Sequence, residues 1–169
     1  MGDEQKTKIL ILDDEPIVLK RLKPALEKSG YDVEAFSRSL EASNRIMEQD
    51  FDIVITDLKM EGLDGMEFLT QVKDRSPLTE VIVITGFATM ETAKESFKKG
   101  VFDFLAKPFK LGEIKEVVEK AESNREVANQ LVRQPGVEID SPPTKIIKDW
   151  RKGKIARDVC LWTVEQEEG

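Results

Sequence analysis

Short apolar runs that recur along the chain, each ending in polar or turn residues, limit the fold most strongly. The runs are rich in Ile and Val and alternate with stretches of helical periodicity, as in parallel strands covered by helices on both faces. The runs are 9–12, 31–36, 53–55, 81–84 and 101–105. The helical stretches are 16–29, 38–48, 65–74, 89–99 and one from about Leu111 onward. The sequence therefore predicts an α/β fold, with a doubly wound five-stranded parallel sheet.

The helical periodicity also predicts which side chains face the sheet. Apolar residues three and four positions apart share one face of a helix, and that face is expected to be buried. In the second helical stretch, the side chains expected to point inward are Leu40, Ile46 and Met47. The fourth stretch is marked by Met90, Ala93 and Phe97. For the second helix we expect Ser37 or Ser39 as the cap.

A functional site is expected at the carboxyl ends of the strands, because ligands of open α/β sheets bind in the crevice there. Five polar side chains lie at these ends, namely Asp13, Asp14, Asp57, Thr85 and Lys107. Taken alone, each has an ordinary explanation as part of an acidic first turn, a cap or a solvated loop. Their occurrence at successive strand ends favours a single site instead.

The residue types at these ends indicate phosphoryl-transfer chemistry. Three crowded carboxylates repel one another unless a cation neutralises them. Their oxygen ligands suit Mg²⁺, whereas the chain has no histidine and only Cys160 to offer a softer metal. One carboxylate is then free to act as a nucleophile and form an acyl phosphate. Lys107 would add positive charge at the phosphoryl oxygens and Thr85 a hydrogen bond.

Together these motifs resemble a known family. The matching stretches are 9–15, 52–60, 63–65, 83–86 and 102–109. Over roughly residues 7–121, the chain is similar to the receiver domains of two-component response regulators. The resemblance implies a flavodoxin-like, receiver-type fold. It also implies a phosphoacceptor signalling protein, which catalyses only its own phosphorylation and dephosphorylation and is not otherwise an enzyme.

The resemblance implies a role for each residue of the site. Asp57 would accept the phosphoryl group, and Lys107 would bind its oxygens. Thr85 would move toward the phosphoryl group, and the rotamer of Phe104 would follow, so these two residues would form the switch. The ligands of Mg²⁺ would be Asp13, Asp14, Asp57 and the backbone carbonyl of Lys59. The phosphoryl donor would be a sensor histidine kinase.

Two features depart from the family pattern or vary within it. Glu61 stands where the family usually has proline, so we expect a less rigid loop there. Lys59 and Phe87 each lie two residues beyond a site residue and would flank the phosphoryl group. We expect these two side chains to restrict attacking water and lengthen the lifetime of the acyl phosphate.

The last helix leaves two alternatives open. An apolar stripe continues from Leu111 to Val132 at spacings of three and four, which would let the helix overrun the receiver, although Arg125 interrupts the stripe. Alternatively, the helix frays after 123–124. The domain boundaries we expect are 1–121 for the receiver, 122–136 for a helix extension and linker, and 137–169 for a short C-terminal tail.

Composition and charge constrain the partners. The formal net charge is −7, so we do not expect direct nucleic-acid binding, and the apolar runs are too short to span a membrane. With one cysteine, a reducing cytoplasm is the expected location. In the tail, the basic stretch 145–157 could contact nucleic acid or an acidic partner, and the apolar stretch 159–164 could add to a sheet edge. We favour docking on protein, in a homodimer formed through 89–133 or through the tail.

The resulting expectation is a response-regulator receiver that takes a phosphoryl group from a sensor histidine kinase onto Asp57, with Mg²⁺, and switches a protein-interaction face. The alternative is a phosphorylation-independent pseudo-receiver that acts as a docking or dimerisation module. A third class, the haloacid-dehalogenase-like phosphohydrolases, needs Asp-x-Asp at the first strand. Glu15 stands at its second position and disfavours that class.

Overall fold

The computed structural model describes residues 5–59 and 64–133, with side chains as far as residue 130. Strands and helices alternate along the described chain, as the sequence predicts. Their bounds are β1 Lys8–Leu12, α1 Pro16–Lys28, β2 Asp32–Phe36, α2 Ser39–Glu48, β3 Ile53–Thr56, α3 Gly65–Arg75, β4 Glu80–Thr85, α4 Met90–Lys98, β5 Asp103–Ala106 and α5 Leu111–Arg133. The features predicted at Glu61 and over 134–169 lie outside the described residues.

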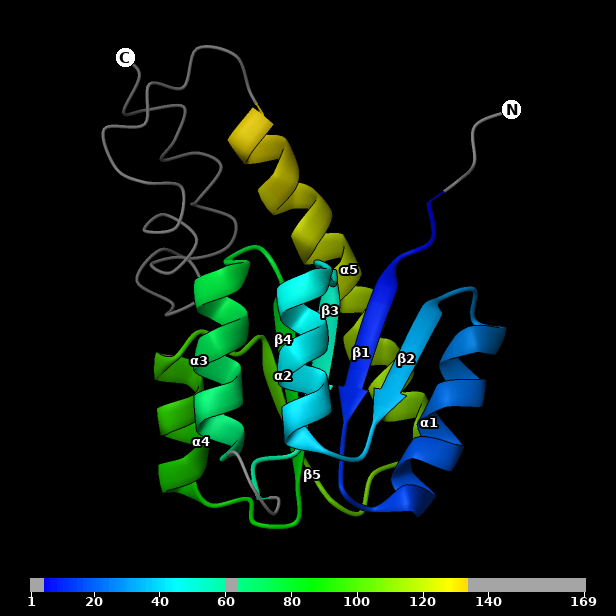
Figure 1. The fold of residues 1–169 in the computed structure, drawn as a ribbon, viewed down its shortest axis with the longest axis vertical. Helices are drawn as coiled ribbons and strands as arrows, with labels where there is room; N and C mark the ends of the chain where they lie inside the picture. The colour runs from blue at the N-terminus through cyan, green and yellow to red at the C-terminus, as the bar shows by residue number, and fades with distance from the viewer. Residues whose placement is uncertain (1–4, 60–63, 134–169) are drawn as a thin grey trace.

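The strands form one parallel sheet in the order β2-β1-β3-β4-β5. Helices α1 and α5 cover one face, and α2, α3 and α4 lie on the other (Figure 1). This arrangement confirms the predicted doubly wound, flavodoxin-like α/β fold. Because all strands run in the same direction, their carboxyl ends meet at one edge of the sheet, which is the lower edge in Figure 1.

The central strands are buried on both faces because successive side chains of a strand point to opposite sides. In β1, Ile9 and Ile11 pack against α1 and α5, whereas Leu10 and Leu12 pack against α2 and α3. Full burial of one such side chain is worth about 1.5–3 kcal/mol. The residues of β3 and β4 are likewise all buried, while β2 and β5 are partly exposed edges. The best-packed strands are therefore those that lead into the predicted carboxylates and Thr85.

Local sequence signals set the helix ends near the site. The Asp64 carboxylate caps α3 by accepting the N–H of Met66 at 3.2 Å. Helix α4 begins with a capping box, in which the side chains of Thr89 and Thr92 each accept the backbone N–H of the other. The same helix ends before Gly100, whose φ of 94° is a conformation that glycine adopts without strain. These local signals thus set where α3 begins and where α4 begins and ends.

Helix α2 buries a different face from the expected one. It begins at Ser39, which is its first helical residue rather than its cap, and its buried face consists of Ser39, Ala42 and Ile46. The expectation for Ile46 is confirmed, but Leu40 and Met47 are 71% and 64% exposed. Both lie about a quarter-turn from the buried face, so the prediction for these two residues was wrong.

Helix α4 is also less buried than expected. Met90 is 74% exposed and Phe97 40%, Ala93 is partly buried, and Ser96 is the buried residue of this helix. The helix lies at the edge of the sheet against β5. An edge strand covers only part of the apolar face of a helix, and the rest remains exposed.

Helix α5 runs without a break to Arg133, so the predicted continuation is confirmed and fraying after 123–124 was wrong. Polar contacts tie the extension to the amino-terminal edge of the sheet. Arg125 Nη2 lies 2.8 Å from Asp52 Oδ1, and Asn124 Nδ2 donates to Glu80 Oε1 at 3.3 Å. The residue that interrupts the apolar stripe therefore pairs with the sheet.

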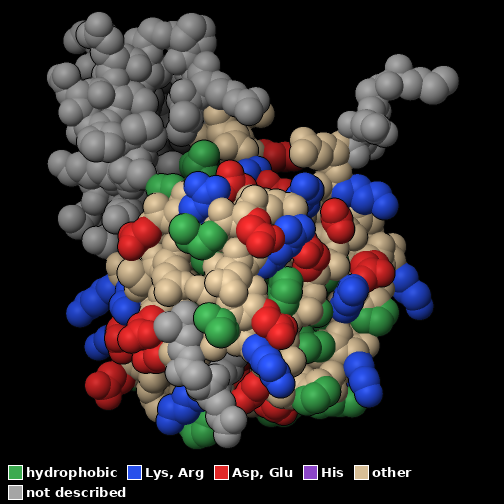
Figure 2. Space-filling view, viewed as in Figure 1, with side chains coloured by type: hydrophobic (Ala, Val, Ile, Leu, Met, Phe, Trp, Pro, Cys, Tyr) green, Lys and Arg blue, Asp and Glu red, His purple; other side chains and the backbone are tan. Residues whose placement is uncertain are grey.

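Over the described residues, no helix combines the length and the hydropathy needed to cross a membrane. On the face drawn in Figure 2, Lys and Arg side chains are interspersed with Asp and Glu side chains, and hydrophobic side chains lie among them. The charge on this face is therefore mixed, although the whole chain is acidic.

Candidate functional site

The fold brings the predicted polar side chains to one edge of the sheet. Asp13 and Asp14 follow β1, Asp57 follows β3, Thr85 ends β4 and Lys107 follows β5. The side chains of Asp13, Asp57 and Thr85 are buried, whereas Asp14 is exposed. The site therefore has a buried floor and one carboxylate open to solvent.

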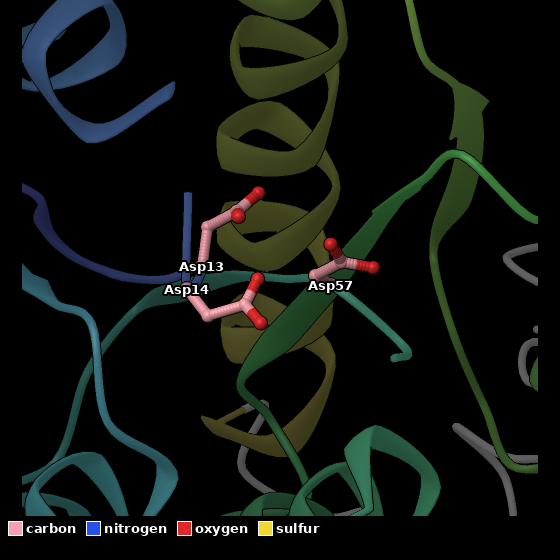
Figure 3. Close-up of side chains that lie close together, drawn as sticks. All are labelled: Asp13, Asp14 and Asp57. Atoms are coloured by element: carbon pink, nitrogen blue, oxygen red, sulfur yellow. The ribbon is translucent and has the colours of Figure 1, made fainter. Parts of the chain in front are cut away.

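The three aspartates form a cluster. One carboxylate oxygen from each of Asp13, Asp14 and Asp57 lies within 4.8 Å of the others, and Figure 3 shows the β1 pair beside the β3 residue. Burial raises the pKa of the Asp13 carboxyl. This effect outweighs the contacts of that carboxyl with Lys107 and with the N–H of Glu15, which donates to Oδ1 at 2.9 Å. The ionised form of Asp13 is therefore incompletely compensated by the protein alone.

Lys107 is the counter-ion of the cluster. Its Nζ lies 2.7 Å from Asp13 Oδ2, 2.8 Å from Glu15 Oε1 and 2.9 Å from Asp57 Oδ2. Burial alone would lower the pKa of this ammonium, but the three carboxylates together raise it above its ordinary value. The backbone N–H of Lys107 donates to the carbonyl of Thr85 at 2.8 Å, which fixes the start of this loop beside β4. The lysine is therefore both charged and held in place.

The oxygen atoms at this site fit a hard divalent cation. Asp13 Oδ2 is buried and accepts no hydrogen bond from the described residues, although the Lys107 ammonium lies beside it as an ion pair. The candidate ligand cluster consists of the three aspartates, and Mg²⁺ prefers a few carboxylates together with water. These residues therefore suit Mg²⁺ better than a soft metal.

The other predicted site residues lie on the loops after β3 and β4 and on β5. The N–H of Lys59 donates to Asp57 Oδ1 at 3.2 Å. The N–H of Phe87 donates to Thr85 Oγ1 at 3.0 Å. Phe104, on β5, is partly buried and packs against the part of the core that lies between the sheet and helices α2 and α3. Lys59 thus lies beside Asp57 and Phe87 beside Thr85, and the roles assigned to these residues and to Phe104 stay predictions.

Two contacts at the site were not foreseen. Glu15 reaches Lys107, which lies 92 residues later in the chain. The acidic run at 13–15 is visible in the sequence, but no pattern shows which way its third side chain turns. Lys59 Nζ lies 4.0 Å from the centroid of the Phe87 ring. These two residues were expected to flank the phosphoryl group, not to contact each other.

Comparison with known proteins gives a consistent result. The family model for the response regulator receiver domain matches residues 9–119. The response regulator protein PilR of Pseudomonas aeruginosa is 30% identical over 171 residues, which cover 97% of this chain and 37% of PilR. The DNA-binding transcriptional regulator NtrC of Escherichia coli is 31% identical over 144 residues, which cover 85% of this chain and 30% of NtrC. The chain spans about a third of the length of these two relatives.

A solved structure agrees with the sequence relatives. The beryllofluoride-activated NtrC4 receiver domain dimer is 33% identical with a TM-score of 0.67, and the match covers 70% of this chain and 98% of that one. The expectation that nucleic-acid binding is absent finds no support here, because NtrC is a DNA-binding regulator. An acidic net charge describes the whole chain and does not exclude a local nucleic-acid contact.

The family model matches well over half of the chain, and its range runs from β1 into the first part of α5. Every residue of the aspartate cluster, with Thr85 and Lys107, lies within that range. The chain therefore belongs to the response regulator receiver domain family, the receivers of two-component signalling systems.

Proposed function

We propose that this chain is a phosphoacceptor that takes a phosphoryl group from a sensor histidine kinase onto Asp57 and then switches a protein-interaction face. The observation that carries this proposal is the environment of Asp57, which is buried beside two other aspartates and 2.9 Å from the Lys107 ammonium. A nucleophilic carboxylate next to fixed positive charge is what phosphoryl transfer to aspartate requires. The protein would catalyse its own phosphorylation and dephosphorylation and no other reaction.

In the transfer, a carboxylate oxygen of Asp57 attacks the phosphorus of the donor phosphohistidine. The P–N bond breaks, its electron pair stays on the imidazole nitrogen, and that nitrogen takes up a proton. Asp57 is left as an acyl phosphate. The Lys107 ammonium, already beside Asp57, would contact the phosphoryl oxygens, and the Thr85 hydroxyl would donate to one of them. These two groups would stabilise charge in both the transition state and the product.

We propose that the reaction depends on Mg²⁺. The protein ligands would be Asp13, Asp14, Asp57 and the backbone carbonyl of Lys59. When bound, the ion would supply positive charge that offsets the carboxylates and the phosphoryl oxygens. The clustering of three carboxylates, two of which share the Lys107 ammonium, supports this assignment. The exposed Asp14 would be the ligand nearest to solvent.

The readout would run from Thr85 to helix α4 and β5. A hydroxyl that turns toward the new dianion leaves space that the partly buried Phe104 ring could take up, which would give two alternative packings. Met90 and Phe97 expose apolar surface on α4, and the face over 89–133 is our candidate for a homodimer contact. The NtrC4 receiver, 33% identical to this chain, is described as a beryllofluoride-activated dimer, which supports the formation of a homodimer on activation.

The decisive experiment is incubation of the full chain with acetyl phosphate and Mg²⁺, followed by intact-mass spectrometry. The wild type is expected to gain the mass of one phosphoryl group, and Asp57→Asn is expected to gain none. Circular dichroism of both proteins checks that the substitution leaves the fold intact.

The outcomes separate the candidate functions. A wild type that stays unlabelled, although it is folded, would identify the phosphorylation-independent pseudo-receiver. Rapid multiple turnover of acetyl phosphate without accumulation of the acyl phosphate would identify a phosphohydrolase. Light scattering of the full chain before and after beryllofluoride addition tests the homodimer, which is expected only after addition.

A further inference from the structure

Two exposed side chains contact each other across the mouth of the site. Lys59 lies on the loop after β3 and Phe87 on the loop between β4 and α4. The Lys59 Nζ sits 4.0 Å from the centroid of the Phe87 ring, well within the range of a cation–π interaction. The Phe87 side chain is 54% exposed, so the hydrophobic core does not fix its position. The contact with Lys59 is therefore a main constraint on this ring.

The backbone N–H groups of the same two residues donate hydrogen bonds to the side chains of Asp57 and Thr85. The N–H of Lys59 donates to Asp57 Oδ1 at 3.2 Å, and the N–H of Phe87 donates to Thr85 Oγ1 at 3.0 Å. The cation–π contact thus joins the phosphoacceptor carboxylate to the Thr85 hydroxyl across two loops.

The contact also reaches helix α4. The carbonyl of Phe87 accepts a hydrogen bond from Thr92 Oγ1 at 3.1 Å, and Thr92 forms the capping box of α4 with Thr89. The loop that carries Phe87 is therefore held at three points, by Lys59, by Thr85 and by the first turn of α4. None of these points lies in the hydrophobic core.

We propose that Lys59 and Phe87 are positioning residues that hold the Thr85 hydroxyl in its resting orientation, so that separation of their side chains is part of the response to phosphorylation. The inference rests on the proposed function. In the resting state the Thr85 oxygen accepts the N–H of Phe87. Turning toward a phosphoryl group breaks that bond and displaces the loop. A dianion on Asp57 attracts the Lys59 ammonium more strongly than an aromatic ring does.

The strength of the contact sets the size of the expected effect. A cation–π interaction at an exposed site corresponds to about a 2- to 5-fold change in an equilibrium. If the contact favours the resting state, its loss raises the population of the binding-competent state by that factor. The half-saturating concentration of beryllofluoride then falls by about 2- to 5-fold, because apparent affinity scales with the competent fraction.

The test is a double-mutant cycle on the full chain in the presence of Mg²⁺, read by NMR of the α4 amides during a beryllofluoride titration. Phe87→Leu removes the aromatic ring and keeps the net charge. It is expected to lower the half-saturating concentration and to move the α4 peaks of the unloaded protein toward their loaded positions. Phe87→Tyr keeps the ring and is expected to match the wild type. Leu40→Ala, which removes an exposed apolar side chain on α2, away from the site and from α4, is the control.

The second arm of the cycle isolates the pair. In a Lys59→Met background, Phe87→Leu is expected to have no further effect, because the partner of the ring is already gone. An equal effect of Phe87→Leu in both backgrounds, or no effect in either, would overturn the inference while leaving the proposed function intact. A wild type whose peaks do not respond to beryllofluoride would overturn both.

Discussion

Gly65 decides how closely helix α3 approaches the backbone that follows β3. It is the first residue of that helix, and its N–H donates to the carbonyl of Leu58 at 3.1 Å. A Cβ at this position would lie 2.5 Å from Leu58 Cα and 2.7 Å from the Leu58 carbonyl oxygen, and closer still to the carbonyl oxygen of Asp57. All of these atoms belong to the backbone, so no side chain can rotate to make room. The close approach of α3 to the backbone of Asp57 and Leu58 thus depends on the absence of a side chain at this position.

We predict that Gly65→Ala lowers the free energy of unfolding by about 1–3 kcal/mol, the usual cost of overpacking. Because the loop that carries Asp57 must shift, the same variant should also lose part of its acyl-phosphate yield. Urea unfolding and mass spectrometry measure the two effects.

The matched control is Gly112→Ala, in the first turn of α5. A Cβ at that position meets no atom within 4 Å. The substitution is expected to raise the free energy of unfolding by about 0.4–1 kcal/mol, because alanine restricts the unfolded chain without straining the folded one. A similar loss of stability in both variants would show that the close approach at Gly65 is not the cause.

At this scale the sequence predicts which residues meet but not how every side chain turns. The convergence of Asp13, Asp57 and Lys107 follows from topology, because parallel strands end at one edge. The contact of Glu15 with Lys107 depends on loop rotamers, for which no periodicity exists. Thus the convergence of these side chains was predictable, whereas their detailed pairing was not.

Among the elements, the central strands β1, β3 and β4 were predicted to within one residue at each end, because their apolar runs end abruptly in polar residues. Helix α2 shows the difficulty with short helices, because the prediction placed Leu40 and Met47 on the buried face that Ser39, Ala42 and Ile46 in fact form. A small error in rotational phase changes the buried set when only three positions define it. Helix α4 shows a second limit, because periodicity reports an apolar face but not whether a neighbour covers it.

The extension of α5 makes an ion pair with the residue before β3 that periodicity could not reveal. Arg125 and Asp52 are each about a quarter exposed, and Asp52 Oδ2 also accepts the N–H of Lys8 at 2.8 Å. We predict that Arg125→Ala costs about 1–2 kcal/mol of unfolding free energy, between the values for surface and buried pairs. Hydrogen exchange should show faster exchange of the α5 amides beyond Ala121, with acyl-phosphate formation retained.

Lys120→Ala provides the comparison on the same helix. Lys120 pairs with Glu116 at 3.0 Å, but both side chains are more than 60% exposed. The expected change is within about 0.5 kcal/mol, because solvent screens such a pair. Amide exchange in the extension is expected to rise less in Lys120→Ala than in Arg125→Ala. Equal rises in the two variants would show that the ion pair between Arg125 and Asp52 does not hold the helix.

In the molecule as a whole, the crowded carboxylates of the site lower the free energy of unfolding. The buried carboxylates of Asp13 and Asp57 share the ammonium of Lys107 with the more exposed Glu15, and the Asp14 carboxylate lies close to both aspartates. A buried charge that is incompletely paired costs free energy, and a domain of this kind has only about 5–15 kcal/mol of net stability. A cation that binds only the folded state recovers part of this cost and couples occupancy of the site to global unfolding.

We predict that Mg²⁺ raises the free energy of unfolding of the full chain, by about 1.4 kcal/mol when its concentration is ten times its Kd. Thermal unfolding followed by circular dichroism, with ionic strength held constant by NaCl, measures this rise. Asp14→Asn alters an exposed ligand without disturbing the core, so it should keep the metal-free stability and lose most of the Mg²⁺-dependent gain. An equal gain in Asp14→Asn, or the same gain from NaCl alone, would mean that general screening acts instead of a bound ion.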